Sequence, residues 1–243
     1  MAGRARIDKL LVERGLFESR ARAQAAVLAG QVTANGEVVR KPAQEVDAEA
    51  ELVAQDVHPF VSRGGLKLMA GLDAFGFDPK AKRALDVGAS TGGFTDVLLS
   101  RGVGHVVAVD VGHDQFHARL RGRPDVDLWE GTDIRRLTWE QVGAPVDLIV
   151  TDVSFISLSL VLPPALAFAA GRAALVALVK PQFEAGPALV RKGLVRDPAV
   201  HATVCARVEA QVTALGWQVK GLIPSPIAGG DGNLEFLLGA VRF

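Results

Sequence analysis

The stretch Leu85-Asp-Val-Gly-Ala-Ser-Thr-Gly-Gly-Phe-Thr-Asp-Val-Leu-Leu99 decides the fold of this chain. It predicts a buried strand over 83–87, a glycine-rich turn, and a helix that begins near Gly92. Glycines in such a turn let the backbone bend sharply and approach a ligand closely. The helix start presents unpaired amide groups to an anionic part of that ligand. The stretch therefore predicts a nucleoside-cofactor site at the end of a strand.

Predicted strands and helices alternate from residue 83 onward. We expect strands at 83–87, 105–110, 126–130, 146–151, 173–179, 217–223 and 234–241. Helices are expected at 92–101, 113–121, 135–142, 157–170 and 198–215. This alternation predicts an α/β fold whose mainly parallel sheet is covered on both faces. Because no helix separates the last two strands, they are expected to form an antiparallel pair.

The N-terminal segment is locally basic. Residues 1–41 carry eight basic and four acidic side chains, whereas residues 42–60 carry five acidic side chains and no Lys or Arg. Helices over 6–13 and 19–28 and a hairpin around Asn35-Gly36 are predicted. By themselves these basic residues are best explained as a solvated helix face. Together with the hairpin and the family resemblance given below, they would bind RNA phosphates. The candidate RNA-binding residues, at the start of the first helix and on the second, are Arg4, Arg6, Arg20 and Arg22.

Composition excludes several classes of protein. The 243 residues, 49% hydrophobic, can bury one substantial core and a small second domain. The single cysteine, Cys205, excludes an intramolecular disulfide framework and a cysteine-rich zinc site, and we expect a buried structural thiol. No signal peptide or membrane-spanning apolar run is evident, so we expect a cytoplasmic protein without membrane interaction.

Three carboxylates at successive strand ends indicate a cofactor site. Asp110 stands where a nucleoside-binding fold needs a ribose acceptor, and Asp133 could bind an adenine amino group. Asp86 precedes the glycine turn. Singly, each could equally be a cap or turn residue. Ser90 replaces the middle glycine that lets a pyrophosphate approach, which disfavours NAD and FAD and favours S-adenosylmethionine.

Three charged residues interrupt apolar runs that should be buried, namely Asp152, Lys180 and Glu235. Buried charges are costly unless they are paired, and a structural ion pair is the commoner explanation for any one of them. Asp152 and Lys180, however, end strands beside the expected pocket, where open α/β sheets place their active sites. A lysine among apolar walls can serve as a base and activate a hydroxyl.

Several motifs in the same order resemble the TlyA family across almost the whole chain. They are Arg63-Gly-Gly-Leu-Lys67, the 85–99 stretch, Asp152-Val-Ser-Phe155, Val179-Lys-Pro-Gln-Phe183 and Gly232-Asn-Leu-Glu-Phe236. Members of that family are RNA 2′-O-methyltransferases, also described as haemolysins, with an FtsJ-like catalytic domain. The resemblance implies a class I, Rossmann-like methyltransferase with a seven-stranded sheet. Residues 4–50 resemble the S4-type (alpha-L) RNA-binding module at the N-terminus of these proteins.

The resemblance also implies a catalytic Lys-Asp-Lys-Glu tetrad, matched here by Lys67, Asp152, Lys180 and Glu235. Lys67 enters on the resemblance alone. In this hypothesis neutral Lys180 removes or polarises the ribose 2′-hydroxyl proton, the other three residues orient it, and no metal is needed. The candidate residues for binding S-adenosylmethionine are Asp86, Gly88, Ser90, Gly92, Phe94, Asp110 and Asp133.

These expectations divide the chain into an RNA-binding domain at 1–58, a linker at 59–64 and a methyltransferase domain at 65–243. The implied partner is ribosomal RNA or a ribosomal subunit, with cytidine as the family precedent. The modified nucleotide and the oligomeric state stay open, although we favour a monomer. The alternatives are a membrane-active haemolysin, an RNA-binding protein with a degenerate methyltransferase domain, and a base methylase.

Overall fold

The chain divides between Pro59 and Phe60 into two units, and each is described by itself. The computed structural model describes residues 3–55, 58–229 and 232–243. In the first unit the elements are β1 (Arg4–Arg6), α1 (Ile7–Glu13), α2 (Arg20–Leu28), β2 (Val32–Ala34), β3 (Glu37–Val38), β4 (Glu45–Asp47) and β5 (Leu52–Ala54). β1 pairs with β4, and β3, β2 and β5 form a three-stranded antiparallel sheet.

The two helices and the hairpin predicted for the first unit are confirmed. The Ser19 hydroxyl accepts a hydrogen bond from the Arg22 amide and caps α2. Asn35 and Gly36, with φ of 51° and 80°, form the two-residue turn between β2 and β3. The placement of Arg4 and Arg6 was wrong: they lie on β1, before α1 begins, because this segment pairs with β4.

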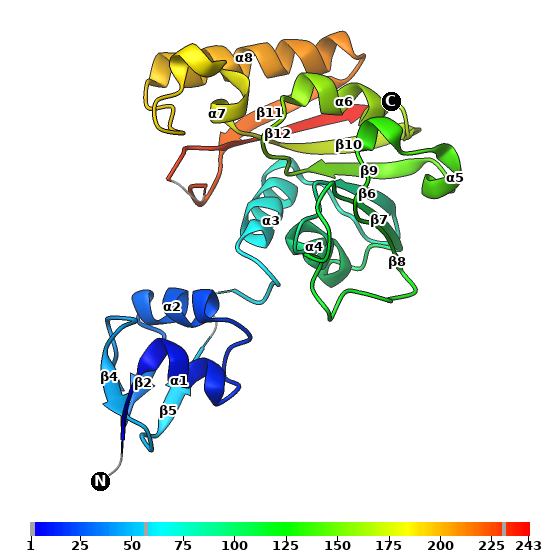
Figure 1. The fold of residues 1–243 in the computed structure, drawn as a ribbon. Helices are drawn as coiled ribbons and strands as arrows, with labels where there is room; N and C mark the ends of the chain where they lie inside the picture. The colour runs from blue at the N-terminus through cyan, green and yellow to red at the C-terminus, as the bar shows by residue number, and fades with distance from the viewer. Residues whose placement is uncertain (1–2, 56–57, 230–231) are drawn as a thin grey trace. The chain divides into compact units, whose positions relative to one another are not determined.

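The second unit is built on a seven-stranded sheet in the order β11-β12-β10-β9-β6-β7-β8 (Figure 1). The strands are β6 (Arg83–Val87), β7 (His105–Val109), β8 (Val126–Trp129), β9 (Val146–Thr151), β10 (Ala169–Val179), β11 (Gln218–Pro224) and β12 (Phe236–Arg242). The pairs from β10 to β8 are parallel, and β12 is antiparallel to both β10 and β11. The predicted fold class, including the antiparallel last pair, is confirmed.

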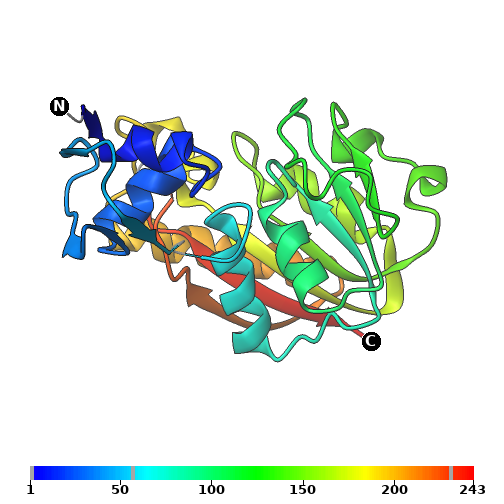
Figure 2. The same ribbon diagram turned by 90° about the horizontal axis from the view of Figure 1, so that it is seen from below.

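Helices cover both faces of this sheet, as Figures 1 and 2 show. α3 (Gly64–Phe75) and α4 (Gly93–Ser100) pack on one face, where Leu68, Leu72 and Leu98 are buried. α6 (Leu158–Leu166) and α8 (Pro198–Ala214) pack on the other, where Leu162 and Val208 are buried. The short helices are α5 (Trp139–Val142), α7 (Pro181–Glu184), and the 3₁₀ turns η1 (Ile134–Arg136) and η2 (Pro187–Leu189).

The predicted helix at 113–121 does not form. In its place lies a series of bends and turns that buries Phe116 and Leu120. The Glu130 carboxylate accepts hydrogen bonds from the amides of Gln115 and Phe116, at 2.9 and 3.1 Å. Asp114 has φ of 57°, in the left-handed region, which interrupts a right-handed helix, and the contacts with Glu130 hold the resulting turn.

Two other predicted helices are shorter than expected. The 135–142 segment splits into η1 and α5, because Thr138 forms a capping box with Gln141 and starts a new helix. The 157–170 helix ends at Leu166. β10 then begins at Ala169, four residues earlier than its predicted start at 173.

The segment expected as a linker is partly packed into the second unit. Phe60 and Val61 are buried in the core beneath α3 and α4, and the Val61 amide donates to the Asp96 carboxylate at 2.8 Å. The ring of Phe60 fills the space beside Gly65. These contacts fix the start of α3 to the rest of the second unit.

We expect Gly239→Ala to destabilise the second unit by about 1–3 kcal/mol, because a methyl group there would overlap the Phe75 ring of α3. Gly171→Ala is the matched control: nothing lies within 4 Å of its added methyl group. That control should change the free energy of unfolding by no more than about 0.5 kcal/mol. Denaturant unfolding of both variants checks this, and equal stability would contradict it.

Candidate active site

The glycine turn after β6 brings two loops into backbone contact. Gly88 has φ of 86°, and a Cβ at this position would lie 2.6 Å from the carbonyl oxygen of Asp152. The amides of Gly88 and Ala89 both donate to the carbonyl of Val109. The turn therefore touches the carboxyl ends of β7 and β9, the strands on either side of β6. Only glycine fits at position 88.

Ser90 adopts the backbone conformation of the glycine it replaces. Its φ is 47°, in the left-handed region, where non-glycine residues are strained. The Ser90 amide donates to Asp110 Oδ2 at 2.7 Å, and its hydroxyl donates to Gln115 at 3.3 Å. These two hydrogen bonds hold the strained residue against Asp110 and Gln115.

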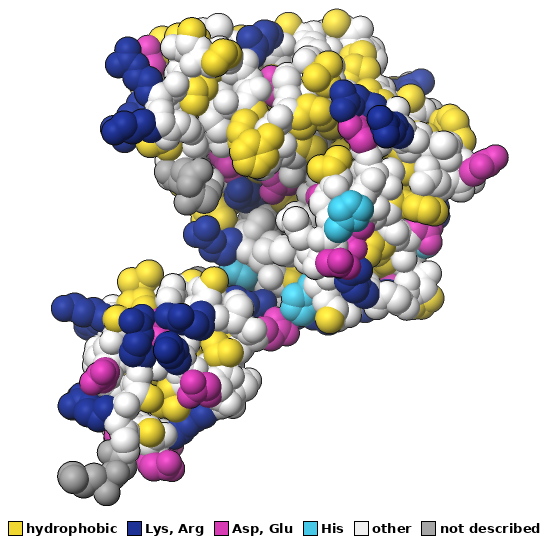
Figure 3. Space-filling view, in the orientation of Figure 1, with side chains coloured by type: hydrophobic (Ala, Val, Ile, Leu, Met, Phe, Trp, Pro, Cys, Tyr) yellow, Lys and Arg dark blue, Asp and Glu magenta, His cyan; other side chains and the backbone are white. Residues whose placement is uncertain are grey.

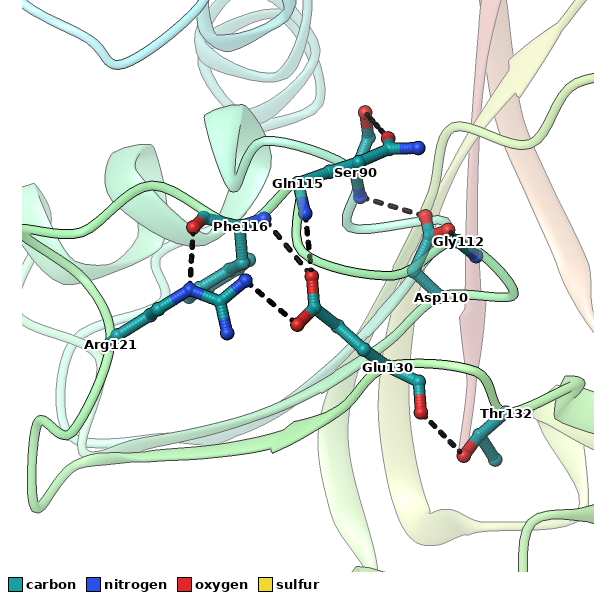
Figure 4. Close-up of polar contacts among 8 residues, drawn as sticks. All are labelled: Ser90, Asp110, Gly112, Gln115, Phe116, Arg121, Glu130 and Thr132. Carbon is teal, nitrogen blue, oxygen red and sulfur yellow. Dashed lines mark hydrogen bonds and ion pairs between the residues drawn. The ribbon is translucent and has the colours of Figure 1, made fainter.

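The larger of two adjoining cavities, about 350 Å³, lies over the ends of β6, β7 and β9. It is lined by Gly88, Ser90, Asp110 and Asp133 together with the apolar side chains of Val153, Ile156 and Val161. Asp110 accepts from the amides of Ser90 and Gly112, which fixes its carboxylate at the rim (Figure 4). A largely apolar pocket with a few oriented carboxylates suits a nucleoside.

Asp133 also lines this cavity, but its oxygens are engaged. Arg135 binds both of them through its guanidinium, and its amide donates to Oδ1. The hydrogen bonds from Arg135 lower the pKa of Asp133 to about 2. The carboxylate is therefore ionised and already partnered.

Glu130 is a structural residue of the site that the sequence interpretation did not select. It follows β8 directly, and besides the two amides its carboxylate binds Arg121 at 2.8 Å (Figure 4). This contact shapes the 113–121 segment, including Gln115, which lines the cavity. An acidic residue at the end of a strand, the signal that selected Asp110, is the signal that could have found it.

The remaining cofactor candidates support the turn. Asp86 lies on β6 beneath it, lines neither cavity, and accepts a hydrogen bond from Thr95 at 2.7 Å. Complete burial raises the pKa of Asp86 to about 7. Gly92 begins α4 with φ of 91°, where a Cβ would meet Leu120 at 2.5 Å. Phe94 is buried and lines the second cavity.

That second cavity, about 330 Å³, holds the charged candidates. Lys67, Asp152 and Lys180 line it, with Gly88 and Ser90 shared between the two cavities. Lys180 Nζ lies 2.6 Å from Asp152 Oδ1, and Lys67 Nζ lies 2.5 Å from Glu235 Oε2. Glu235 is only 3% exposed and precedes β12, whereas the sequence placed it inside that strand. The four residues form two ion pairs, and three of the four line this cavity, whereas Glu235 reaches it only through its contact with Lys67.

Ser154 is a second residue that the sequence interpretation missed. It lines both cavities, and its hydroxyl accepts a hydrogen bond from Lys180 Nζ at 2.9 Å. It lies within the Asp152–Phe155 motif, but a serine there carries no charge to mark it in the sequence.

The arginines of the first unit are partly tied down. Asp8 is fully buried and pairs with Arg6 at 3.0 Å and Arg20 at 2.8 Å, and the Arg6 guanidinium is the main cause of its lowered pKa. Arg22 pairs with Glu18, while Arg4 donates to the backbone carbonyl of Glu45. Lys and Arg side chains gather on the face of this unit that Figure 3 shows, with isolated acidic side chains among them.

Cys205, on α8, lines neither of the two cavities. Cys205 is buried, and burial raises the pKa of its thiol to about 11. Among the residues that the structure describes, no cluster of His, Cys, Asp and Glu is arranged to hold a metal ion. Within the same residues, no helix is both long and apolar enough to cross a membrane.

Comparison with known proteins matches each of the two units to a family. The FtsJ-like methyltransferase family matches residues 60–242, and the S4 domain matches residues 5–52. Over 241 residues the chain is 46% identical to the 16S/23S rRNA (cytidine-2′-O)-methyltransferase TlyA of Mycobacterium tuberculosis, covering 98% of this chain and 90% of that relative. It is 36% identical over 235 residues to Hemolysin A of Brachyspira hyodysenteriae, covering 96% and 98%. A solved Streptococcus thermophilus structure, described as a candidate hemolysin, is 40% identical with a TM-score of 0.77, covering 100% and 90%.

We predict that Asp86→Asn changes how the stability of the protein depends on pH. The folded-state pKa of about 7 lies above the ordinary value of about 3.9. Between these values the native state holds a proton that the unfolded state releases, so wild-type stability falls as pH rises. The asparagine does not titrate, so the melting temperature of the variant relative to wild type should rise from about pH 4 to 7 and then level off. Calorimetry at pH 4–8 measures this difference, and a constant one would contradict the buried carboxyl's titration.

Proposed function

Since this chain belongs to the FtsJ-like methyltransferase family, we propose that it transfers a methyl group from S-adenosylmethionine to a ribose 2′-hydroxyl of ribosomal RNA. The observation that carries the proposal is the pair of lysine–carboxylate contacts at the smaller cavity. That cavity adjoins the larger one, which suits a nucleoside. Cytidine, named for the Mycobacterium tuberculosis relative, is the proposed nucleotide. A ribosomal substrate would place the activity in the cytoplasm.

The proposed cofactor fits the residues of the larger cavity. Asp110 would accept hydrogen bonds from the ribose hydroxyls and Asp133 from the adenine amino group, while Ile156 and Val161 give the purine an apolar wall. Gly88 would allow close approach, and Asp86, Gly92 and Phe94 would hold the turn. When bound, S-adenosylmethionine supplies an electrophilic methyl group on a sulfonium and leaves as a neutral thioether.

Lys180 would act as the base. In its neutral form it takes the 2′-hydroxyl proton onto Nζ, and Asp152, 2.6 Å away, stabilises the ammonium that forms. Lys67, which lines the same cavity and is paired with Glu235, would orient the ribose. No charged leaving group develops, so positioning would supply most of the acceleration.

The first unit would bring the RNA to this site. We assign RNA binding to residues 1–58 and methyl transfer to residues 65–243, with 59–64 joining them. The S4 domain match and the exposed arginines support this assignment. The two phosphate-binding candidates that keep most freedom are Arg4, which bonds only a carbonyl in the described structure, and Arg20, whose side chain is 49% exposed.

Replacing the base should abolish turnover without loss of cofactor binding. Lys180→Met should lower the methylation rate of ribosomal subunits from a strain lacking this protein by about 100-fold or more. Affinity for S-adenosylhomocysteine should stay within about threefold of wild type by calorimetry. The control Lys220→Met, an exposed residue of β11, should be fully active. Methyl groups mapped to bases, or full activity of Lys180→Met, would refute the proposal.

Replacing Arg4 should weaken RNA binding through charge alone. Arg4→Ala should reduce the slope of log affinity against log salt by about 0.7–0.9, the loss of one phosphate contact. Filter binding to ribosomal subunits at several salt concentrations measures this slope. Arg123→Ala, which removes an exposed arginine paired with Asp125 in the second unit, is the control. An unchanged slope for Arg4→Ala would remove this residue from the RNA contact.

A further inference from the structure

Ser154 lies where the two cavities meet. It belongs to the loop between β9 and α6, lines both cavities, and accepts the hydrogen bond of Lys180 Nζ at 2.9 Å. Its side chain is exposed, so packing does not explain its position. The hydroxyl is therefore the part of this residue that needs an explanation.

Asp152 and Ser154 hold the Lys180 amine in different ways. The contact with Asp152 is an ion pair at 2.6 Å, whose strength depends mainly on distance. The contact with Ser154 has hydrogen-bond geometry, which depends on direction as well. Within the described residues, Asp152 Oδ1 accepts no hydrogen bond, so Ser154 is the partner whose contact with the amine is directional.

Contacts elsewhere in the second unit hold the loop of Ser154 in place beside the segment that begins at Lys180. The Asp152 amide donates to the Val87 carbonyl at 3.0 Å, which fixes the start of the serine's loop. Its end is held by Glu184 of α7, a buried carboxylate that accepts from the Leu158 amide at 2.7 Å and from the Ser157 hydroxyl at 2.8 Å. Because α7 begins directly after Lys180, Glu184 ties the serine's loop to the lysine's.

We propose that Ser154 is a positioning residue that aims the lone pair of neutral Lys180 at the ribose 2′-hydroxyl. The inference rests on the proposed function, in which Lys180 is the base. A neutral amine has two hydrogens and one lone pair. With one hydrogen donated to Ser154 and the other toward Asp152, the lone pair takes the remaining tetrahedral direction in the cavity that all three residues line. The 2′-hydroxyl proton would then move onto Nζ while the hydroxyl oxygen forms the bond to the methyl carbon, the bond between sulfur and that carbon breaks, and a neutral thioether leaves.

The test separates the hydroxyl from the shape of the side chain. Ser154→Thr keeps the hydroxyl. Ser154→Val has the shape of the threonine side chain but no hydroxyl. We expect kcat of the valine variant to fall roughly 10-fold, with KM for ribosomal subunits and affinity for S-adenosylhomocysteine changed by less than about threefold. The threonine variant should keep at least about half of the wild-type kcat. Thr213→Val, which removes an exposed hydroxyl of α8 that lines neither cavity, is the control.

The outcomes distinguish the two proposals. If Lys180→Met is inactive and the threonine and valine variants have equal kcat, the role of Ser154 is refuted while the base remains. If Lys180→Met is fully active, the proposed function fails and the role of Ser154 fails with it. A valine variant that loses S-adenosylhomocysteine binding would show a structural role and also overturn the inference. Should that variant not fold, Ser154→Ala takes its place, with the same expected loss of kcat.

Discussion

The ion pair between Lys67 and Glu235 joins parts of the second unit that are 168 residues apart in the sequence. Lys67 lies on α3, before the first strand of the large sheet, and Glu235 lies just before its last strand. Both side chains are at least nine-tenths buried, so each charge depends on the other for compensation. Removing one partner of such a pair typically costs about 3–5 kcal/mol, because the other charge stays buried. The wall of the smaller cavity therefore depends on α3 and β12 being in place together.

A second constraint, the common edge at which the parallel strands end, explains why the two cavities adjoin. Parallel strands end at one edge of a sheet, and the chain must leave each strand there. At Gly88 the turn after β6 comes so close to the loop after β9 that a methyl group would overlap the Asp152 backbone. Asp152 is thereby held between the expected cofactor cavity and Lys180. The glycine thus lets the cofactor turn and the Asp152 backbone meet at a common point.

Local patterns predicted the strands well because each one is a short apolar run that is buried by its neighbours. They predicted Asp152 and Lys180 for the opposite reason, since a charge at the end of such a run is conspicuous. The helix at 113–121 was wrong because Asp114 has a left-handed backbone, with φ of 57°, and the segment is held by contacts with Glu130, 14 and 15 residues further on. The apolar pattern of the sequence could not select Lys67 as a site residue, because nothing near it in the sequence indicates that its partner is Glu235. Ser154 was missed because its importance depends on a lysine 26 residues away.

The two ends of the proposed nucleoside site are not equally prepared for a ligand. Asp110 is held by the amides of Ser90 and Gly112, which orient its oxygens without neutralising their charge. Asp133 is held by the guanidinium of Arg135, whose side chain is half exposed. A donor arriving at Asp110 finds a carboxylate with unused lone pairs, whereas a donor arriving at Asp133 has to share its oxygens with a cation or displace it. The ribose end is thus built by the backbone of the glycine turn, and the adenine end depends on a surface ion pair that can rearrange.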